Sequence, residues 1–292
     1  TPKVKAIHPD LSWEVHPAEA GPDAAAGRHV LTLSGGGDPR LRALTERWVR
    51  AGEASERFVF RPAHQARPAS LTGTLRHHDH ELDLSHAAFG VRLDRRRVRF
   101  EVAVYHPDFL FLSEEEQHDI AGIVMRLMLG EDDVARWVGP LRPAVEKPVD
   151  ALPAEHVRVV VADVAERYRR PGWAEVSGMA PDGRPLVGRT LFPLRRVDFP
   201  LCELHVALAV PYKQRDRQGL PGKRAEAALR GFEEVLVGGL GDDGILAAHI
   251  TGDGSRVFHL YVDPESGATD RIAARAGEWD QGRPQLQAAA DP

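Results

Sequence analysis

The sequence contains a single cysteine, Cys202, so no disulfide can form within one chain. No apolar run approaches the roughly 20 residues needed to cross a bilayer, and the first residues lack the apolar segment of a secretory signal. Lys and Arg number 38 against 43 Asp and Glu, so no basic excess suggests nucleic-acid binding. These absences predict a cytoplasmic protein, without a membrane segment, whose partner is not nucleic acid.

Signature motifs of common enzymes are also missing. There is no GxSxG nucleophile elbow and no HExxH pair. The glycines of Gly35–Gly37 fit neither phosphate-loop pattern, and a tight strand-to-helix turn explains them as well as phosphate binding does. Cys202 lies in an alternating apolar stretch that predicts a strand with a buried core thiol. We therefore expect no cofactor and no recognisable catalytic constellation.

Hydrophobic periodicity predicts an α+β fold, with paired strands and amphipathic helices in both halves of the chain. The expected helices begin near Pro39, Ser113 and Val157 and after Pro221, and Ser113 with Glu116 forms a capping box. The expected strands cover 11–15, 30–33, 58–60, two or three segments within 71–105, then 185–197, 201–211, 245–251 and 257–262. The last two form a hairpin around Asp253-Gly254.

A proline-rich stretch suggests where the domains divide. Residues 140–150 contain three prolines and show no periodicity. We expect an extended linker there, between an N-terminal domain at 1–142 and a C-terminal domain at 151–292, each with antiparallel sheets.

The segment 77–83 is the richest source of metal ligands. On a strand, His78 and His80 would share one face, and two imidazoles with a carboxylate can hold a transition metal. The spacing matches no standard site, so these histidines are weak candidates and we expect an exposed segment without a tightly bound metal. The acidic runs 114–116 and 131–133 are expected at helix N-termini, where the helix dipole stabilises them.

One part of the C-terminal half resembles a known family. The stretch VALAVPYKQRDRQGLPGKRAEAALRGFEEVLVGGL, followed by HITGDGSRVFHLYVD, is similar to the bacterial family of unknown function numbered six-nine-five. The positions that carry the resemblance are Gly219, Leu220, Pro221, Phe232, Glu233, Thr251, Gly254, Arg256, Phe258 and Tyr261. More distantly, that family resembles ferredoxin-like regulators that bind ribonucleases. The resemblance implies a ferredoxin-like C-terminal domain and, from the family's usual ending, a short tail after Asp291-Pro292.

The candidate binding residues lie in the same region: Arg256, Tyr261, His259 and Asp216. Alternation in the last strand of the hairpin places His259 and Tyr261 on one face and Phe258 on the other. Arg256 is the residue least explained by folding. It either pairs with Asp253, Asp216 or Glu233 inside the fold, or it meets an acidic ligand, and the internal pair is favoured.

Two functions remain open at this point. The first is a noncatalytic protein-binding or regulatory module that acts through a sheet face or edge, with another protein as partner. The second is a hydrolase-type enzyme whose site in a cleft between the domains uses some of His77, His80 and His106. The oligomeric state is left open.

Overall fold

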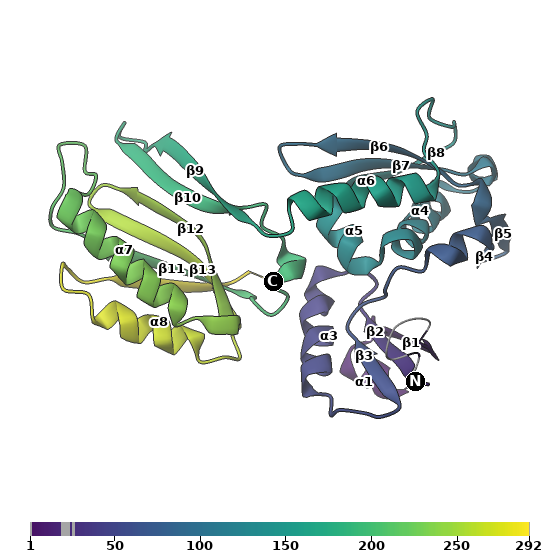
Figure 1. Cartoon of the computed structure of the whole chain (residues 1–292), viewed down its shortest axis with the longest axis horizontal. Coiled ribbons are helices and arrows are strands. Elements are labelled where there is room, and N and C mark those ends of the chain that lie inside the picture. Colours follow the sequence, from purple (N-terminus) through teal and green to yellow (C-terminus); the bar gives the residue numbers. More distant parts are fainter. Residues whose placement is uncertain (1, 19–23, 25–26, 292) are drawn as a thin grey trace. The chain divides into compact units, whose positions relative to one another are not determined.

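The structure is a computed structural model that describes residues 2–18, 24 and 27–291. Pro292, after which the sequence predicts a tail, lies outside the described residues. The chain forms two compact units, Thr1–Arg169 and Arg170–Pro292 (Figure 1). In the ranges described, no helix combines the length and the apolar character needed to cross a membrane.

The first unit begins with a small mixed sheet. β1 (Ser12–Pro17) pairs antiparallel with β2 (His29–Ser34), and β2 pairs parallel with β3 (Phe58–Arg61). The helix α3 (Pro39–Ala51) connects the parallel strands, and the shorter α1 (Pro2–Ile7) precedes β1. α3 begins where expected, because the Asp38 side chain accepts a hydrogen bond from Arg40 N and Pro39 occupies the first turn.

The remainder of the first unit is a larger α+β body. Its strands are β4 (Thr74–His77), β5 (His80–Asp83), β6 (Ala88–Asp94), β7 (Arg99–Tyr105) and β8 (Val138–Ala144), and its helices are α4 (Glu114–Leu129), α5 (Glu131–Trp137) and α6 (Ala154–Arg167). β7 lies between β6, which is antiparallel to it, and β8, which is parallel. The capping box of Ser113 and Glu116 opens α4 as predicted.

The structure corrects the boundary expected from the proline-rich stretch. Residues 138–144 form the strand β8 at the edge of the sheet, where prolines are tolerated because one side of the strand needs no hydrogen bonds. After it, α6 buries Val157, Val161 and Val164 in the core of the first unit. The chain therefore divides after α6, and the residues before Arg170 belong with the N-terminal unit.

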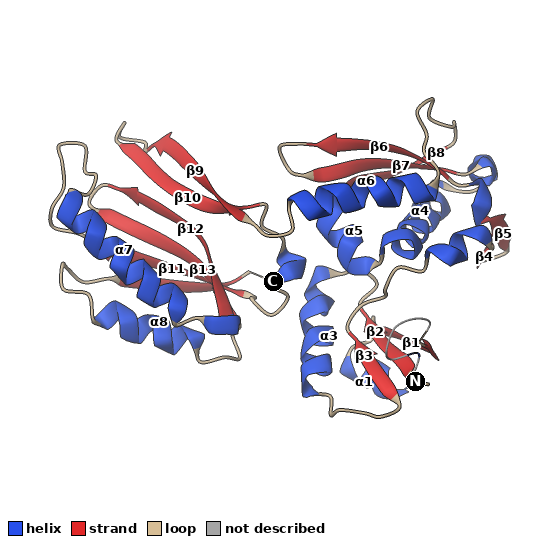
Figure 2. Ribbon diagram, viewed as in Figure 1, coloured by secondary structure: helices blue, strands red, loops and turns tan. Residues whose placement is uncertain are grey.

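The second unit is a single antiparallel sheet with helices on one side (Figures 1 and 2). Its elements are β9 (Gly172–Met179), β10 (Pro185–Phe192), β11 (Leu204–Pro211), α7 (Lys223–Gly238), β12 (Gly244–Gly252), β13 (Ser255–Val262), α8 (Ala268–Gly277) and β14 (Gln285–Ala290). The strands lie in the order β14-β11-β13-β12-β10-β9. α7 and α8 pack on the part formed by β11, β12 and β13, while no residue of β9 or β10 joins their core.

The α+β class is confirmed, and so is the predicted hairpin. Asp253 and Gly254 both adopt positive φ, as the tightest hairpin turns require. Gly219 also has a positive φ, of 84°, and a Cβ there would lie 3.1 Å from Asp253 Cα. Strand β9, helix α8 and strand β14 were not predicted. Cys202 is buried as expected but precedes β11 and does not lie on a strand.

Candidate functional site: the open face of the C-terminal sheet

The register of the antiparallel strands assigns every residue of the C-terminal sheet to one of two faces. Directly opposed residues point the same way, so Val257 of β13 shares a face with Ala209 and Ile250. Ile250 in turn opposes Gly188 of β10, and Gly188 opposes Val176 of β9. α7 and α8 cover the other side of the sheet (Figure 2). We call the side that contains Val176 and Val257 the open face.

The open face carries no charged side chain. Its members are Gly172, Ala174, Val176, Gly178, Leu186, Gly188, Thr190, Phe192, Ile245, Ala248, Ile250, Gly252, Ser255, Val257, His259, Tyr261, His205, Ala207, Ala209, Pro211, Gln285, Gln287 and Ala289. All six strands lie in the described part of the chain, and none of these positions is Lys, Arg, Asp or Glu. Antiparallel sheets that face water on one side usually alternate between apolar and polar residues. An uncharged outer face is therefore a feature that folding alone does not require.

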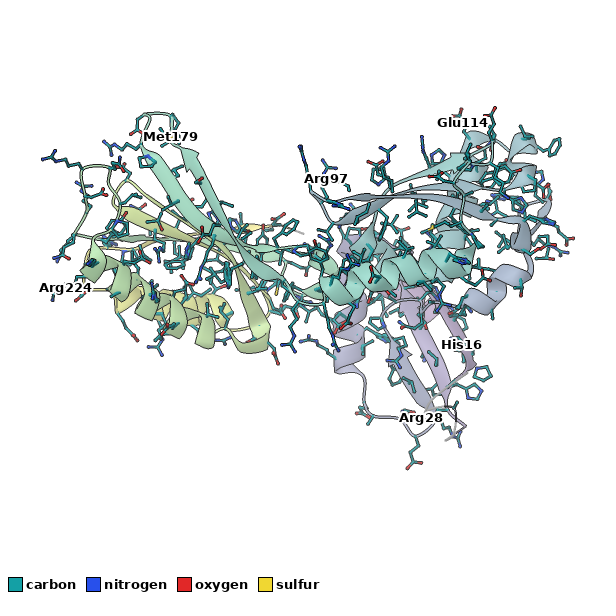
Figure 3. All side chains as sticks on the ribbon, turned by 45° about the horizontal axis from the view of Figure 1, so that its top comes forward. His16, Arg28, Arg97, Glu114, Met179 and Arg224 are labelled. Atoms are coloured by element: carbon teal, nitrogen blue, oxygen red, sulfur yellow. The ribbon has the colours of Figure 1, made fainter. Side chains whose placement is uncertain are left out.

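Large apolar side chains of the open face gather near its β9 edge. Val176 is 40% exposed, Ile250 38% and Phe192 37%. β9 is the last strand of the sheet, so one row of its backbone groups has no strand partner. Met179 lies at the end of β9, at the tip of the hairpin (Figure 3), and belongs to the opposite face of the sheet. Apolar groups at an unpaired edge are typical of protein interaction sites.

Two histidines and a tyrosine, including two of the predicted candidates, meet on the open face. His205 Nε2 lies 3.1 Å from His259 Nδ1, and the two rings stack with centroids 5.3 Å apart. The ring of Tyr261 lies 5.1 Å from that of His205. Burial, and then the neighbouring His205, lower the pKa of His259 below its usual value. The neutral form of His259 is therefore favoured, which suits a face without Lys, Arg, Asp or Glu.

A cavity of about 280 Å³ lies at the end of the open face beside Tyr261. Its lining includes Cys202, Ile245, Arg196 and Asp291. The Tyr261 hydroxyl donates a hydrogen bond of 2.6 Å to Asp291 Oδ2. This carboxylate, together with burial, raises the pKa of Tyr261 to about 12. The phenol is therefore a fixed donor, and it is not poised for acid–base chemistry near neutral pH.

Arg256, the first of the predicted candidates, lies on the covered face. Its guanidinium Nη2 is 2.8 Å from Glu226 Oε2, Nη1 is 3.9 Å from Glu233 Oε2, and Nε donates to Thr251 Oγ1. The expected internal ion pair is confirmed, although the nearer carboxylate is Glu226, which was not among the three expected. Arg256 is buried on the side of the sheet opposite to His259 and Tyr261.

The same buried network contains a histidine–carboxylate pair. His249 Nδ1 lies 2.7 Å from Glu233 Oε2, and Arg189 pairs with the other oxygen of this carboxylate. Trp173 covers Arg189, whose Cζ lies 4.5 Å from the ring centroid. Burial raises the pKa of Glu233, but hydrogen bonds from His249 and Arg189 outweigh burial and lower it. With its two oxygens engaged by His249 and Arg189, the Glu233 carboxylate ties α7 to the sheet.

Asp216, the fourth candidate, stabilises a loop away from the histidine pair. Its Oδ1 accepts hydrogen bonds from Gln218 N and Leu220 N, and its own backbone N donates to Leu220 O. These contacts hold the Gly-Leu-Pro segment in front of α7. Of the four candidates, the structure thus brings only His259 and Tyr261 together.

The histidines of the predicted metal segment do not come together as a ligand set. His77 and His80 oppose each other across a tight hairpin, with His78 in the turn at positive φ, so His78 and His80 do not share a face as expected. His80 lies 3.7 Å from Glu116, and His77 lies 4.0 Å from Asp119. Over the described ranges, no three His, Cys, Asp or Glu side chains are arranged to hold a metal.

His106, the third histidine of the enzyme alternative, and the acid Glu131 are both buried. His106 Nε2 lies 2.8 Å from Asp83 O. Glu131 lies at the start of α5, as expected for the acidic run 131–133. Its carboxylate also accepts hydrogen bonds from Ser34 Oγ at 2.6 Å and His64 N at 3.1 Å, and so links α5 to the end of β2 and to the segment after β3.

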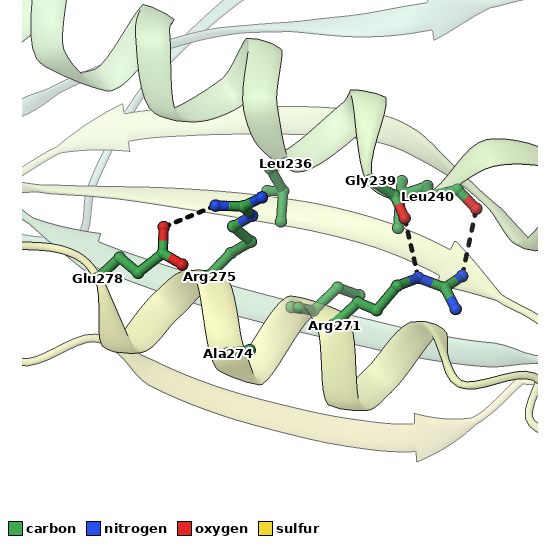
Figure 4. Close-up of a pocket in the computed structure, with 8 residues that line it drawn as sticks. Leu236, Gly239, Leu240, Arg271, Ala274, Arg275 and Glu278 are labelled. Atoms are coloured by element: carbon green, nitrogen blue, oxygen red, sulfur yellow. Dashed lines mark hydrogen bonds and ion pairs between the residues drawn. The ribbon is translucent and has the colours of Figure 1, made fainter.

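A cavity of about 260 Å³ lies between α7 and α8 (Figure 4). Arg271 donates to Gly239 O at 2.9 Å and Leu240 O at 3.4 Å, and Arg275 pairs with Glu278 at 2.7 Å. Arg271 thus donates to the carbonyl oxygens of the two residues after α7. These carbonyl groups have no hydrogen-bond donor within the helix. This cavity is explained by the packing of the two helices.

The residues at the β9 edge were missed because β9 itself was not predicted. Its sequence GWAEVSGM alternates, with Ala174, Val176 and Gly178 on one face and Glu175 and Ser177 on the other. That alternation, together with the absence of charge at every second position of β11, was the available signal. What the sequence could not supply was the strand order that joins these positions into one surface.

No protein-family model matches the chain, and no curated protein matches it. The resemblance to the bacterial family of unknown function therefore rests on the quoted motif and stays a prediction.

Proposed function

We propose that the chain is a noncatalytic protein-binding module whose docking surface is the open face of the C-terminal sheet. The observation that carries the proposal is the lack of any charged side chain across six strands on the side without helices. A water-facing sheet surface gains solubility from charge, so a surface without charge is better suited to contact with another protein. The exposed Val176, Ile250 and Phe192 supply apolar area at one edge of it.

The strand order supports a ferredoxin-like interpretation of this unit. β11, α7, β12, β13, α8 and β14 follow one another as βαββαβ, with β14-β11-β13-β12 as spatial order. β9 and β10 extend this arrangement by one hairpin. A bacterial, cytoplasmic setting fits the single buried Cys202 and the motif resemblance.

The hydrolase alternative gains no support from the groups that motivated it. His77, His80 and His106 face carboxylates or carbonyl oxygens of their own unit. The Glu233–His249 pair is the arrangement closest to an acid–base dyad, but its carboxylate is also paired with arginines. A general base needs a nitrogen aimed at a nucleophile or substrate. The buried His77 Nε2 makes no hydrogen bond, but the described group beside it is the Asp119 carboxylate at 4.0 Å, which is not a nucleophile.

Site-specific photo-crosslinking tests the proposal with a matched control. Val176 and Val187 are valines on neighbouring strands of one hairpin, each 40% exposed, but they lie on opposite faces. A photoreactive residue at 176 should yield protein adducts in the native cell, and the same residue at 187 should yield few. Equal yields at both positions, or none at 176, would contradict the open face as docking surface.

A further inference from the structure

The size of the open face is the first clue to what covers it. Six strands spaced about 4.8 Å apart, with eight residues at about 3.3 Å each, span roughly 700 Å². A standard protein–protein interface buries about 800 Å² on each partner. The outline of the open face thus approaches the area that one side of a stable complex requires.

The charge of the open face restricts the chemistry of its partner. Nucleic acids and anionic lipid surfaces are held by Lys and Arg, and the six strands present neither on this side. A strongly charged protein surface would lose its hydration without gaining an opposite charge. The partner must therefore be flat, uncharged and largely apolar. The open face itself meets each of these conditions.

We propose that the occupant of the open face is a second copy of this chain, with the two sheets packed face to face. This inference rests on the proposed function, because it names the partner of the same surface. A two-fold contact places the same patch on both sides, so like charges would oppose each other if the patch carried any. The strand positions of this face carry none, so two copies can meet there without charge repulsion.

The side chains of the open face also suit sheet-on-sheet packing. Aligned sheets pack about 10 Å apart, with side chains interdigitating between them. The centre of the face is made of small residues such as Ala207, Ala209 and Ala248, while Val257 and Ile250 rise beside them. Gly188 cannot accept a Cβ, which would lie 2.1 Å from His249 O. The small residues thus leave shallow positions between the larger side chains of Phe192, His205, His259 and Tyr261, and a second sheet can interdigitate with this relief.

Sedimentation velocity of the purified chain tests this proposal. Interfaces of this size reach micromolar affinity or better, so the chain should be a dimer at about 50 µM. Val176→Glu places a carboxylate within the contact and should weaken the dimer at least tenfold. Val187→Glu, the same change at the same exposure on the opposite face, should leave the dimer unchanged. Ile250→Lys places a positive charge on the same face and should weaken the dimer as well. If only Val176→Glu weakens it, the effect is specific to the acidic residue and not to charge in the contact.

Three results would overturn the proposal: a wild-type chain that stays monomeric, a Val176→Glu variant as dimeric as wild type, or equal weakening by Val187→Glu. Circular dichroism and thermal melting confirm that each variant folds, and these surface changes should preserve both. If the chain is monomeric while crosslinks from position 176 capture a different protein, the dimer is refuted and the binding function stands. If position 176 captures nothing as well, both are refuted.

Discussion

Replacing Glu233 by Gln removes one charge from the buried network beneath α7. The carboxylate lies 2.7 Å from His249 and 3.9 Å from Arg256, and it also pairs with Arg189. Removing one partner of a buried ion pair costs about 3–5 kcal/mol, because the remaining charges lose their compensation. Gln keeps the shape and one hydrogen-bond acceptor, and Arg189 is partly solvated. We therefore expect a loss of about 3 kcal/mol in the free energy of unfolding at pH 7.

The loss should depend on pH in a defined direction. The folded-state pKa of Glu233 is lowered, so its ionised form stabilises the fold above the unfolded pKa of about 4.3. As the pH falls below that value and through the folded pKa, the wild type binds a proton at Glu233 and loses the same contribution. The difference between wild type and Glu233→Gln should therefore shrink in acid.

Urea denaturation monitored by tryptophan fluorescence measures the free energy of unfolding of both proteins. Trp173 reports on the network because it covers Arg189. With a slope of about 2 kcal/mol per molar urea, a loss of 3 kcal/mol lowers the midpoint by about 1.5 M. Glu234→Gln is the control, since Glu234 is the next residue on α7 and is exposed. A Glu233→Gln midpoint within about 0.2 M of wild type, or a difference constant from pH 7 to pH 3, refutes the reasoning.

Three further predictions follow from individual contacts. Gly219→Ala should cost about 1–2 kcal/mol in a denaturant melt, because the positive φ and the close approach of Asp253 both disfavour a Cβ. Asp291→Asn should lower the pKa of Tyr261 from about 12 toward the usual value, visible in an ultraviolet titration as loss of the most basic tyrosine. Glu131→Ala should cost about 2–3 kcal/mol by thermal melting, because it leaves the hydroxyl of Ser34 and a backbone N–H unpaired.

Local sequence signals predicted the elements that are stabilised by local contacts. The capping box at Ser113, the helix start at Asp38 and the hairpin turn at Asp253 each depend on residues a few positions apart. Alternation also placed His259 and Tyr261 on one face. These features need no knowledge of the tertiary fold, which is why the sequence was sufficient for them.

Features that depend on distant contacts were missed. Pro140 and Pro143 suggested a linker. They lie instead in the edge strand β8, which pairs only with β7, and an edge strand tolerates proline because its outer side needs no backbone hydrogen bonds. The partner of Arg256 comes from α7, where Glu226 lies 30 positions away in the sequence and faces the sheet only after folding. The uncharged open face likewise depends on an order of strands that no local pattern specifies.

The most direct test of the open face as a protein-binding surface is hydroxyl-radical footprinting of its side chains in the native cell. Oxidation of Val176 and Ile250 should be markedly lower in cells than in the dilute purified chain, while oxidation of Val187 should be the same in both. Equal oxidation of Val176 and Ile250 in the two settings would show that the face stays exposed and would contradict the account.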